Sequence, residues 1–419
     1  MNITSFSSGV KSLQYVFFDK ISGLWTDLIL YFKINSDYLE LFLLKWNNKH
    51  FLQKKEDYMK KIIPILALLL VLLVPFKMVS AAEKTSDMYY PEDVDDDYWA
   101  HDEIQDFLSA DIIDGKIQYD EDGFPSVYVK PNENITRAEF TKMIVNAMGL
   151  QLKGQAKSFS DVKSGAWYYP YVQIASSNGI ISGRNDGTFH PGDKIKRSEI
   201  AKMVYNAFQN TVQFNPIRKT FSDVPKSSFA YEAIHKNAAN GIIQGYGTTF
   251  KPNDLATRAQ AIVMIYRALH QETTALPDKQ QLIDFVKQFE SNESQYIKDQ
   301  NFDALTQLYK DNTIGYYRAS GLESIDFYQS LKNENAQITI EPIGDPTYNV
   351  KTLNNRYATV ELTNAKVKIT LKSPDFNFDI TEDLSGLFYL KLDSKSQKWK
   401  IYDFQAYNTD PDELPFFGL

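Results

Sequence analysis

The sequence predicts a helical region made of three copies of one unit, followed by an α+β domain in which helices pack on a curved antiparallel sheet. Three observations predict this fold class. The sequence Ile-Thr-Arg-Ala-Glu at residues 135–139 returns, with substitutions, at residues 195–199 and 256–260. Each copy follows a loop that contains a proline, and each opens an apolar pattern of helical spacing. Residues 281–419 show no repeat, and their pattern changes from helical to alternating.

The composition excludes several functional classes. The chain has 419 residues, a net charge of −8 and 43% hydrophobic residues, which is typical of a globular protein with two or three domains. It contains no cysteine, so disulfides, thiolate metal ligands and a cysteine nucleophile are excluded. No predicted domain is strongly basic, so we do not expect nucleic acid as a partner. We also expect no metal ion and no cofactor.

Residues 59–81 are typical of a secretory signal peptide, with two lysines, an apolar run and a Val-Ser-Ala cleavage site. The run is shorter than the about 20 residues of a transmembrane helix, so we expect export without a membrane anchor. A short transmembrane anchor is the alternative. Because a signal peptide stands at the N-terminus, we interpret residues 1–58 as a leader upstream of a true start at Met59. A polar, acidic linker follows at residues 82–92.

Matched residues set the three units at 93–150, 151–210 and 211–272. In each unit an Asp-Val pair begins 22 positions before a glycine, and an aromatic residue stands 16 positions before the same glycine. In chain order the aspartates are Asp93, Asp161 and Asp223, the aromatic residues are Trp99, Trp167 and Phe229, and the glycines are Gly115, Gly183 and Gly245. Such regular spacing indicates an internal repeat.

Each unit predicts two helices. The first spans residues 101–110, 169–178 or 231–240 and ends at a residue suited to a left-handed conformation. The second begins at the repeated arginine, where a threonine and an acid or amide three positions later form a capping box. Lys196 occupies the threonine position in the second unit, so that box is incomplete. The first unit also carries an insertion whose acidic turn, residues 120–123, is more typical of a solvated turn than of a calcium loop.

The repeated arginines, Arg137, Arg197 and Arg258, are candidates for binding an anion. A cation at the first turn of a helix opposes the helix dipole, so its position requires another reason. Free backbone N–H groups at a helix start, together with a planar guanidinium, suit a carboxylate or phosphate. The alternative is an intramolecular pair with Glu139, Glu199 or an aspartate of a neighbouring unit.

The aromatic residues at the matched position offer a second kind of contact. An aromatic ring stacks on the apolar face of a sugar, so Trp99 and Trp167 are candidates for lining a sugar-binding groove. Burial between the units is the alternative, and for Phe229 we expect burial.

Together these motifs resemble S-layer homology (SLH) domains, in three tandem copies over roughly residues 93–270. The resemblance implies a pseudo-threefold helical trefoil that binds secondary cell-wall polysaccharide, commonly through pyruvylated sugars. It implies that the three arginines pair with the pyruvate carboxylate or a similar anion. The remaining candidate site residues match other motif positions and are Glu139, Glu199, Asp161, Asp223, Trp99, Trp167 and Gly183. Lys196 and Gln260 depart from the motif, so the grooves need not be equal, and we favour the groove near Arg197 and Trp167.

A linker at residues 273–280 leads to an α+β domain at residues 281–419. Helices are expected at 281–298, 302–309 and 321–331, and strands at 336–342, 357–364, 366–371, 386–392 and 399–406. Helices followed by a strand meander are similar, in element order alone, to the nuclear transport factor 2-like family. The domain has neither histidine nor cysteine, and Asp403, Glu361 and Tyr317 show no convergent arrangement. We therefore expect no catalytic residues.

These observations predict an exported, non-enzymatic protein of a Gram-positive-type cell surface. Its repeats would hold it to anionic wall polysaccharide, and its C-terminal domain would have a binding or structural task. Two alternatives remain. One is a wall-anchored hydrolase, whose C-terminal domain would carry two carboxylates facing each other across a cleft. The other is a subunit of a surface lattice, which is disfavoured because only one small domain follows the repeats.

Overall fold

The computed structural model describes residues 83–121, 123–374 and 377–407. The expected leader and signal peptide lie outside the described residues. The described residues belong to one compact unit. No helix within the described ranges is both long enough and apolar enough to cross a membrane.

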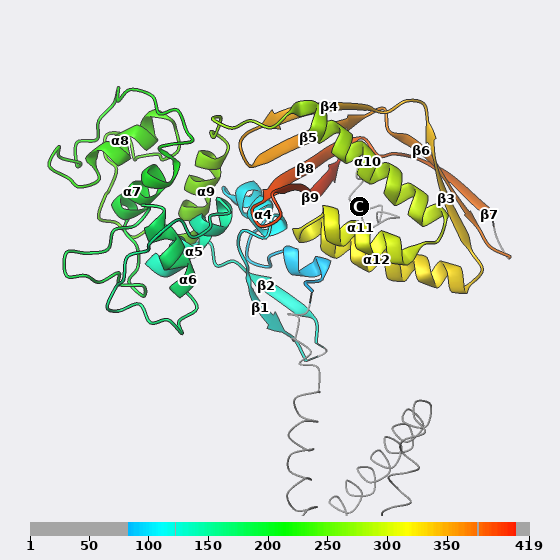
Figure 1. The fold of residues 1–419 in the computed structure, drawn as a ribbon, viewed down its shortest axis with the longest axis horizontal. Coiled ribbons are helices and arrows are strands. Elements are labelled where there is room, and N and C mark those ends of the chain that lie inside the picture. The colour runs from blue at the N-terminus through cyan, green and yellow to red at the C-terminus, as the bar shows by residue number, and fades with distance from the viewer. Residues whose placement is uncertain (1–82, 122, 375–376, 408–419) are drawn as a thin grey trace, which may run out of the picture. The chain divides into compact units, whose positions relative to one another are not determined.

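The helical region contains three pairs of helices, and each pair stands where a unit predicts it (Figure 1). The first helices of the pairs are α4 (His101–Ser109), α6 (Tyr169–Ser177) and α8 (Tyr231–Ala239). The second helices are α5 (Arg137–Ala147), α7 (Arg197–Phe208) and α9 (Arg258–Leu269). Each second helix begins at the repeated arginine, and the α5 and α9 capping boxes are present. In α7 the lysine side chain cannot accept a hydrogen bond, so only the bond from Lys196 N–H to Glu199, 2.9 Å, remains.

Backbone hydrogen bonds join the three units in a closed ring. The N–H of Ile195 donates to the carbonyl of Ile135 at 3.0 Å, that of Ala256 to Ile195 at 3.0 Å, and that of Ile135 to Ala256 at 3.1 Å. These three residues occupy the same motif position and are fully buried. The unit that ends the region therefore bonds back to the unit that begins it.

The insertion in the first unit forms a hairpin of β1 (Lys116–Tyr119) and β2 (Pro125–Tyr128), which pair antiparallel. The sequence analysis did not predict these strands, because they are short and β1 is exposed along its length. Among the residues that the structure describes, no group of three or more His, Asp or Glu side chains is placed to hold a metal ion.

The C-terminal domain begins with α10 (Lys279–Lys298), α11 (Phe302–Asn312) and α12 (Gly315–Asn333). Its strands are β3 (Gln337–Ile343), β4 (Thr347–Leu353), β5 (Tyr357–Thr363), β6 (Lys366–Lys372), β7 (Asn377–Asp383), β8 (Gly386–Asp393) and β9 (Lys398–Ala406). The expected helices and five strands are present, and β4 and β7 are additional. Both added strands are largely exposed, so they lack the apolar alternation that identified the others.

The strands form two antiparallel sheets rather than the single curved sheet that we expected. Their orders are β3-β6-β7 and β4-β5-β8-β9. The chain passes between them at Asn364–Ala365 and returns at Leu384–Ser385, where Leu384 N–H donates to Ala365 O at 3.0 Å. The chain also crosses between the sheets at residues 344–346, which connect β3 with β4. Helices α10 and α12 contact strands of both sheets, and Figure 1 shows the three helices beside the strands.

The helical region and the C-terminal domain share buried contacts. Tyr357 and Tyr402 belong to the same core cluster as the helices of the three units. The Tyr402 hydroxyl donates to Asp106 at 2.6 Å, and the buried ammonium of Lys391 donates to the carbonyl of Ala110 at 2.9 Å. Burial raises the pKa of Asp106 to about 6 and lowers that of Lys391 to about 8. The chain after the units is thus packed against them.

Candidate functional site

The repeated arginines connect neighbouring units. Arg137 and Arg197 are 7% and 3% exposed, which is unusual for arginine. The Nε–H of Arg137 donates to Phe189 O at 2.9 Å, and its Nη1 pairs with Glu199 at 2.7 Å. Both partners lie in the next unit.

The other two arginines repeat this geometry around the ring. Arg258 donates to Val129 O at 2.8 Å and pairs with Glu139 at 3.4 Å. Arg197 donates to Phe250 O at 3.1 Å, but its Nη1 meets the neutral amide of Gln260 at 3.4 Å. The intramolecular ion pair weighed from the sequence is therefore present at Arg137 and Arg258, whereas the hydrogen-bond partners of Arg197 are neutral.

The three guanidinium groups differ in which nitrogens remain available to donate to a ligand. The Nη2 of Arg197 donates to Gln244 O at 2.9 Å, so all three of its nitrogens have partners in the third unit. Burial lowers the pKa of Arg197 below its ordinary value, and nearby acidic groups only partly oppose that effect. Unlike the Nη2 of Arg197, the Nη2 groups of Arg137 and Arg258 make no hydrogen bond to any residue within the described ranges. The sequence favoured a groove near Arg197 and Trp167. None of the Arg197 hydrogen bonds involves Trp167, so these contacts do not connect the two residues.

The repeated aspartates hold the proline loops. Asp161 accepts N–H bonds from Phe189 at 2.8 Å and His190 at 2.6 Å, and Asp223 accepts the corresponding bonds from Phe250 and Lys251 at 2.8 Å each. Burial alone would raise the pKa of each aspartate, but these donors outweigh it, so both pKa values are lowered. These hydrogen bonds of each aspartate therefore lie within its own unit, while its charge also acts on the arginine of the preceding unit.

Gly183 is half-buried and packs against Phe159 within the second unit. Its φ is +74°, and a Cβ atom at this position would lie 2.3 Å from the ring of Phe159. The glycine is therefore required by backbone conformation and by close packing.

The matched aromatic residues stand on the surface. Trp99, Trp167 and Phe229 are 57%, 55% and 67% exposed. The expectation that Phe229 would be buried is wrong, because the residue that packs inward at this turn is its neighbour, Ala230, which is fully buried. The three copies therefore present three exposed aromatic side chains at equivalent positions.

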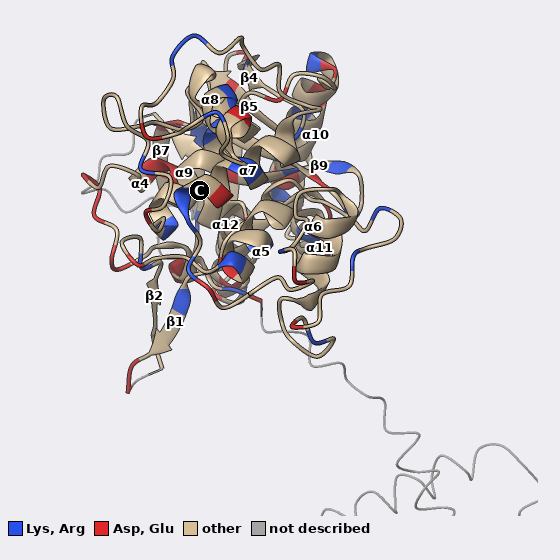
Figure 2. Cartoon of the chain, turned by 90° about the vertical axis from the view of Figure 1, so that its left-hand side faces the viewer, with Lys and Arg blue, Asp and Glu red and all other residues tan. Residues whose placement is uncertain are grey.

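A surface groove of about 530 Å³ lies between the second and third units beside Phe229. Its charged walls come from the second unit and are Arg184, Asp193, Lys194, Lys196 and Glu199. Arg184 pairs with Asp193 at 2.7 Å, and Glu199 is already paired with Arg137, so the two lysines are the cations without a carboxylate partner among the described lining residues. Figure 2 shows that basic and acidic segments are interspersed on this side of the molecule, with no single basic face.

Sequence analysis did not select Arg184, Lys194, Lys196 or Phe229 as groove residues. The signal was present in the two lysines that flank Ile195, but it was interpreted only as a defective helix cap. A site that combines an exposed ring with ammonium groups can stack on a sugar and pair with an anion at the same time.

Comparison with known proteins identifies the repeated sequence. The S-layer homology domain family matches residues 158–201 and 220–262, which are the cores of the second and third units. The first unit is not included in this match.

Similar proteins include an enzyme, an S-layer protein and a cellulosome-anchoring protein. An amylopullulanase of Thermoanaerobacterium thermosulfurigenes is 34% identical over 178 residues, covering 41% of this chain and 9% of the relative. The S-layer protein sap of Bacillus anthracis is 30% identical over 189 residues, covering 45% and 21%. A cellulosome-anchoring protein of Acetivibrio thermocellus is 28% identical over 155 residues, covering 35% and 34%.

The chain spans about a third or less of the length of these relatives. The amylopullulanase match is about as long as the repeat region and covers only 9% of that enzyme, so it shows no activity of this chain. The chain carries S-layer homology domain sequence, and its location is the cell wall or cell surface.

Proposed function

We propose that this protein is a non-enzymatic anchor whose three S-layer homology units bind anionic, pyruvylated secondary cell-wall polysaccharide and display the C-terminal domain. The observation that carries the proposal is the set of exposed aromatic rings at equivalent positions, one of which lines a groove with Lys194 and Lys196. The Lys194 ammonium donates to Asn134 O at 2.6 Å, and neither lysine has a carboxylate partner among the described lining residues. Ring stacking would hold the sugar, and the lysines would pair with its carboxylate.

The first unit is proposed to be a third S-layer homology domain within a trefoil. The closed ring of hydrogen bonds supports this assignment, because the motif residue Ile135 bonds to both other units. The pairing of Arg258 with Glu139 supports it further, since the third unit needs an acid from the first. Loss of the first unit would remove both hydrogen-bond partners of Arg258, Val129 O and Glu139.

The arginines have a narrower role in this proposal than in the sequence analysis. Arg137 and Arg258 remain candidate ligand contacts through Nη2, together with Trp167 and Trp99. Arg197, Asp161, Asp223 and Gly183 are proposed to shape the grooves rather than to touch the ligand, because their polar atoms or surroundings are occupied within the protein.

A wall-anchored hydrolase is less well supported. Glu361 is held by Lys351 at 3.1 Å and Tyr407 at 2.7 Å, and Tyr317 packs against Phe289 with 5.7 Å between ring centroids. Asp403 accepts the N–H of the next residue at 2.8 Å. Each candidate acid–base residue therefore has a structural contact, and a glycosidase requires two carboxyl groups on opposite sides of the substrate.

The C-terminal domain is proposed to be nuclear transport factor 2-like. Three helices packed beside antiparallel strands support that assignment, although the strands form two sheets and not one curved sheet. The architecture alone assigns no activity.

The test is pelleting of the full chain with purified cell-wall sacculi, before and after chemical removal of the secondary polysaccharide. We expect Phe229→Ala and Lys196→Ala to weaken pelleting at least tenfold when combined, with unchanged circular dichroism. Phe124→Ala is the matched control, because Phe124 is also 67% exposed but lies beside the β1–β2 hairpin. Pelleting that survives polysaccharide removal, or that responds equally to the control, would contradict the proposal.

A further inference from the structure

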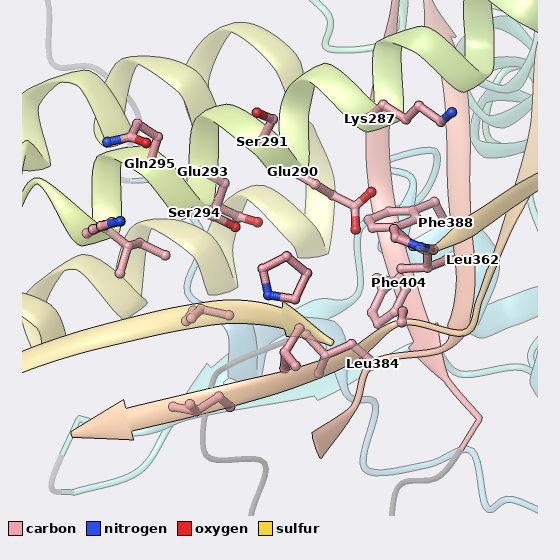
Figure 3. A pocket seen from close by; sticks show the side chains of 18 of the residues that line it. Lys287, Glu290, Ser291, Glu293, Ser294, Gln295, Leu362, Leu384, Phe388 and Phe404 are labelled. Carbon is pink, nitrogen blue, oxygen red and sulfur yellow. The ribbon is translucent and has the colours of Figure 1, made fainter. Parts of the chain in front are cut away.

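The C-terminal domain encloses a cavity that the anchoring function does not use. Its volume is about 460 Å³, and it lies between α10, α11, α12 and strands of both sheets (Figure 3). Most of its wall is apolar or aromatic. The larger side chains of the wall are Tyr309, Tyr317, Tyr328, Leu362, Phe388 and Phe404.

Two carboxyl groups on α10 enter this apolar space. Glu290 and Glu293 are one helical turn apart, so they lie on the same face of the helix, and Figure 3 shows both side chains directed into the cavity. The Tyr309 hydroxyl donates to Glu293 at 2.7 Å. The Oε2 atom of Glu290 is shielded from solvent and has no hydrogen-bond partner among the described residues.

An unpartnered carboxyl oxygen in a cavity requires an explanation, because desolvating it without a hydrogen bond is unfavourable. Burial raises the pKa of Glu290 to about 8 and that of Glu293 to about 7. The protein supplies no cation inside the cavity to oppose this effect. Lys287, Lys298 and Lys366 line it but are exposed, and Lys287 instead lies 5.0 Å from the ring of Tyr348.

We propose that the cavity binds an organic cation, with an ammonium head that pairs with Glu290 and an apolar or aromatic body that fills the space beside Phe388 and Phe404. The lining supports each part of this ligand. The Glu290 carboxyl interacts with Tyr348, but its Oε2 atom has no hydrogen-bond partner among the described residues, so it can accept a cation. The tyrosine and phenylalanine rings attract a cation through their faces. The volume accommodates one small molecule rather than a polymer segment.

The two carboxyl groups do not have catalytic geometry. They project from the same turn of one helix, whereas carboxylates that cleave a glycoside face each other across the bond. A binding role is therefore favoured over hydrolysis. The inference does not depend on anchoring, because sacculus binding and small-molecule binding are measured separately.

The affinity should depend on pH with a defined sign. A cation pairs with the ionised carboxylate, so it competes with a proton, and its affinity should fall about tenfold per pH unit once the pH is below the pKa of Glu290. The other titratable groups that line the cavity, by element, are Lys287, Glu293 and Lys298 on α10, Tyr309 on α11, Tyr317 and Tyr328 on α12, Glu341 on β3, Tyr348 on β4 and Lys366 on β6. The tyrosine pKa values that burial shifts are raised, so those hydroxyls stay neutral over this range.

The experiment is calorimetric titration of the full chain with benzyltrimethylammonium, whose charge does not titrate, and with neutral benzyl alcohol. We expect the cation to bind more tightly at pH 8.5 than at pH 6.5, and Glu290→Gln to weaken it at least tenfold. The affinity for benzyl alcohol should not change with pH or with the Glu290→Gln substitution. Glu334→Gln, an exposed change at the end of α12, is the control.

Three results would overturn the inference. They are no measurable binding of the cation, equal affinity for the neutral probe, and equal affinity in Glu290→Gln and the unmodified chain. If Glu290→Gln does not fold, Glu293→Gln and the pH profile of the unmodified chain supply the same test.

Discussion

The pairing of Arg137 with Glu199 predicts that this arginine stabilises the fold before it touches any ligand. The change Arg137→Met keeps the aliphatic part of the side chain but removes the guanidinium. It leaves the carbonyl of Phe189 without its 2.9 Å donor and the carboxylate of Glu199 without its 2.7 Å partner. Both groups are beside the contact between the first and second units.

The expected loss follows from burial. Breaking a fully buried ion pair destabilises a protein by about 3–5 kcal/mol. The Glu199 side chain is 22% exposed, so water partly compensates it, and we expect about 3 kcal/mol. The double change Arg137→Met with Glu199→Gln should recover about 1 kcal/mol or more, because no unpaired carboxylate remains. Arg184→Met should lose less than about 1 kcal/mol, because both side chains of its pair with Asp193 are more than 40% exposed.

Urea unfolding followed by circular dichroism and by tryptophan fluorescence measures these free energies. The comparison with Arg184→Met controls for the loss of one positive charge. If Arg137→Met and Arg184→Met have the same effect, or if adding Glu199→Gln makes the loss larger, the guanidinium does not join the units and the reasoning fails.

Two further changes test the packing and the buried carboxyl groups. Gly183→Ala should lower the free energy of unfolding by about 3 kcal/mol, because it combines overpacking against Phe159 with strain at φ +74°. Gly187→Ala should lower it by about 1 kcal/mol, because Gly187 has φ +78° but open space around it. Equal losses of stability in thermal unfolding would refute the packing argument. The pKa of Glu290 is raised in the folded state, so its contribution to stability is fully present near pH 4 and is lost as the pH rises through about 8. Urea unfolding between pH 5 and pH 9 should show that Glu290→Gln reduces the decrease in the free energy of unfolding as the pH rises. If this free energy changes with pH equally in Glu290→Gln and in the control Glu334→Gln, the prediction is wrong.

Much of the local structure follows from short-range patterns. The first helices of the units end within one residue of their predicted ends, because an asparagine followed by glycine, or an aspartate in the left-handed region, stops a helix wherever it stands. The second helices begin at the predicted arginines because the capping box is a contact over three residues. Strands β4 and β7 were missed because neither buries a full face.

The candidate site was less accessible to such reasoning. The arginines were found because they recur, but recurrence does not distinguish a ligand contact from a structural pair. Phe229 was placed wrongly because an apolar residue type indicates burial only on average, and its neighbour Ala230 takes the inward position. The cavity in the C-terminal domain was not predicted from the sequence. Glu290 and Glu293 lie on a helix, and the strands that complete the cavity wall follow much later in the chain.

The sequence by itself determined that this chain repeats a unit of two helices three times and ends in an α+β domain, because periodicity, caps and turn residues act over a few positions. It also indicated the S-layer homology domains, through motifs whose residues lie close together along the chain. Only the tertiary structure decided that Arg137 meets Glu199, that the ring closes from Ala256 to Ile135, and that Glu290 faces an apolar cavity. These contacts join residues many positions apart, so they depend on how the elements pack and not on any local pattern.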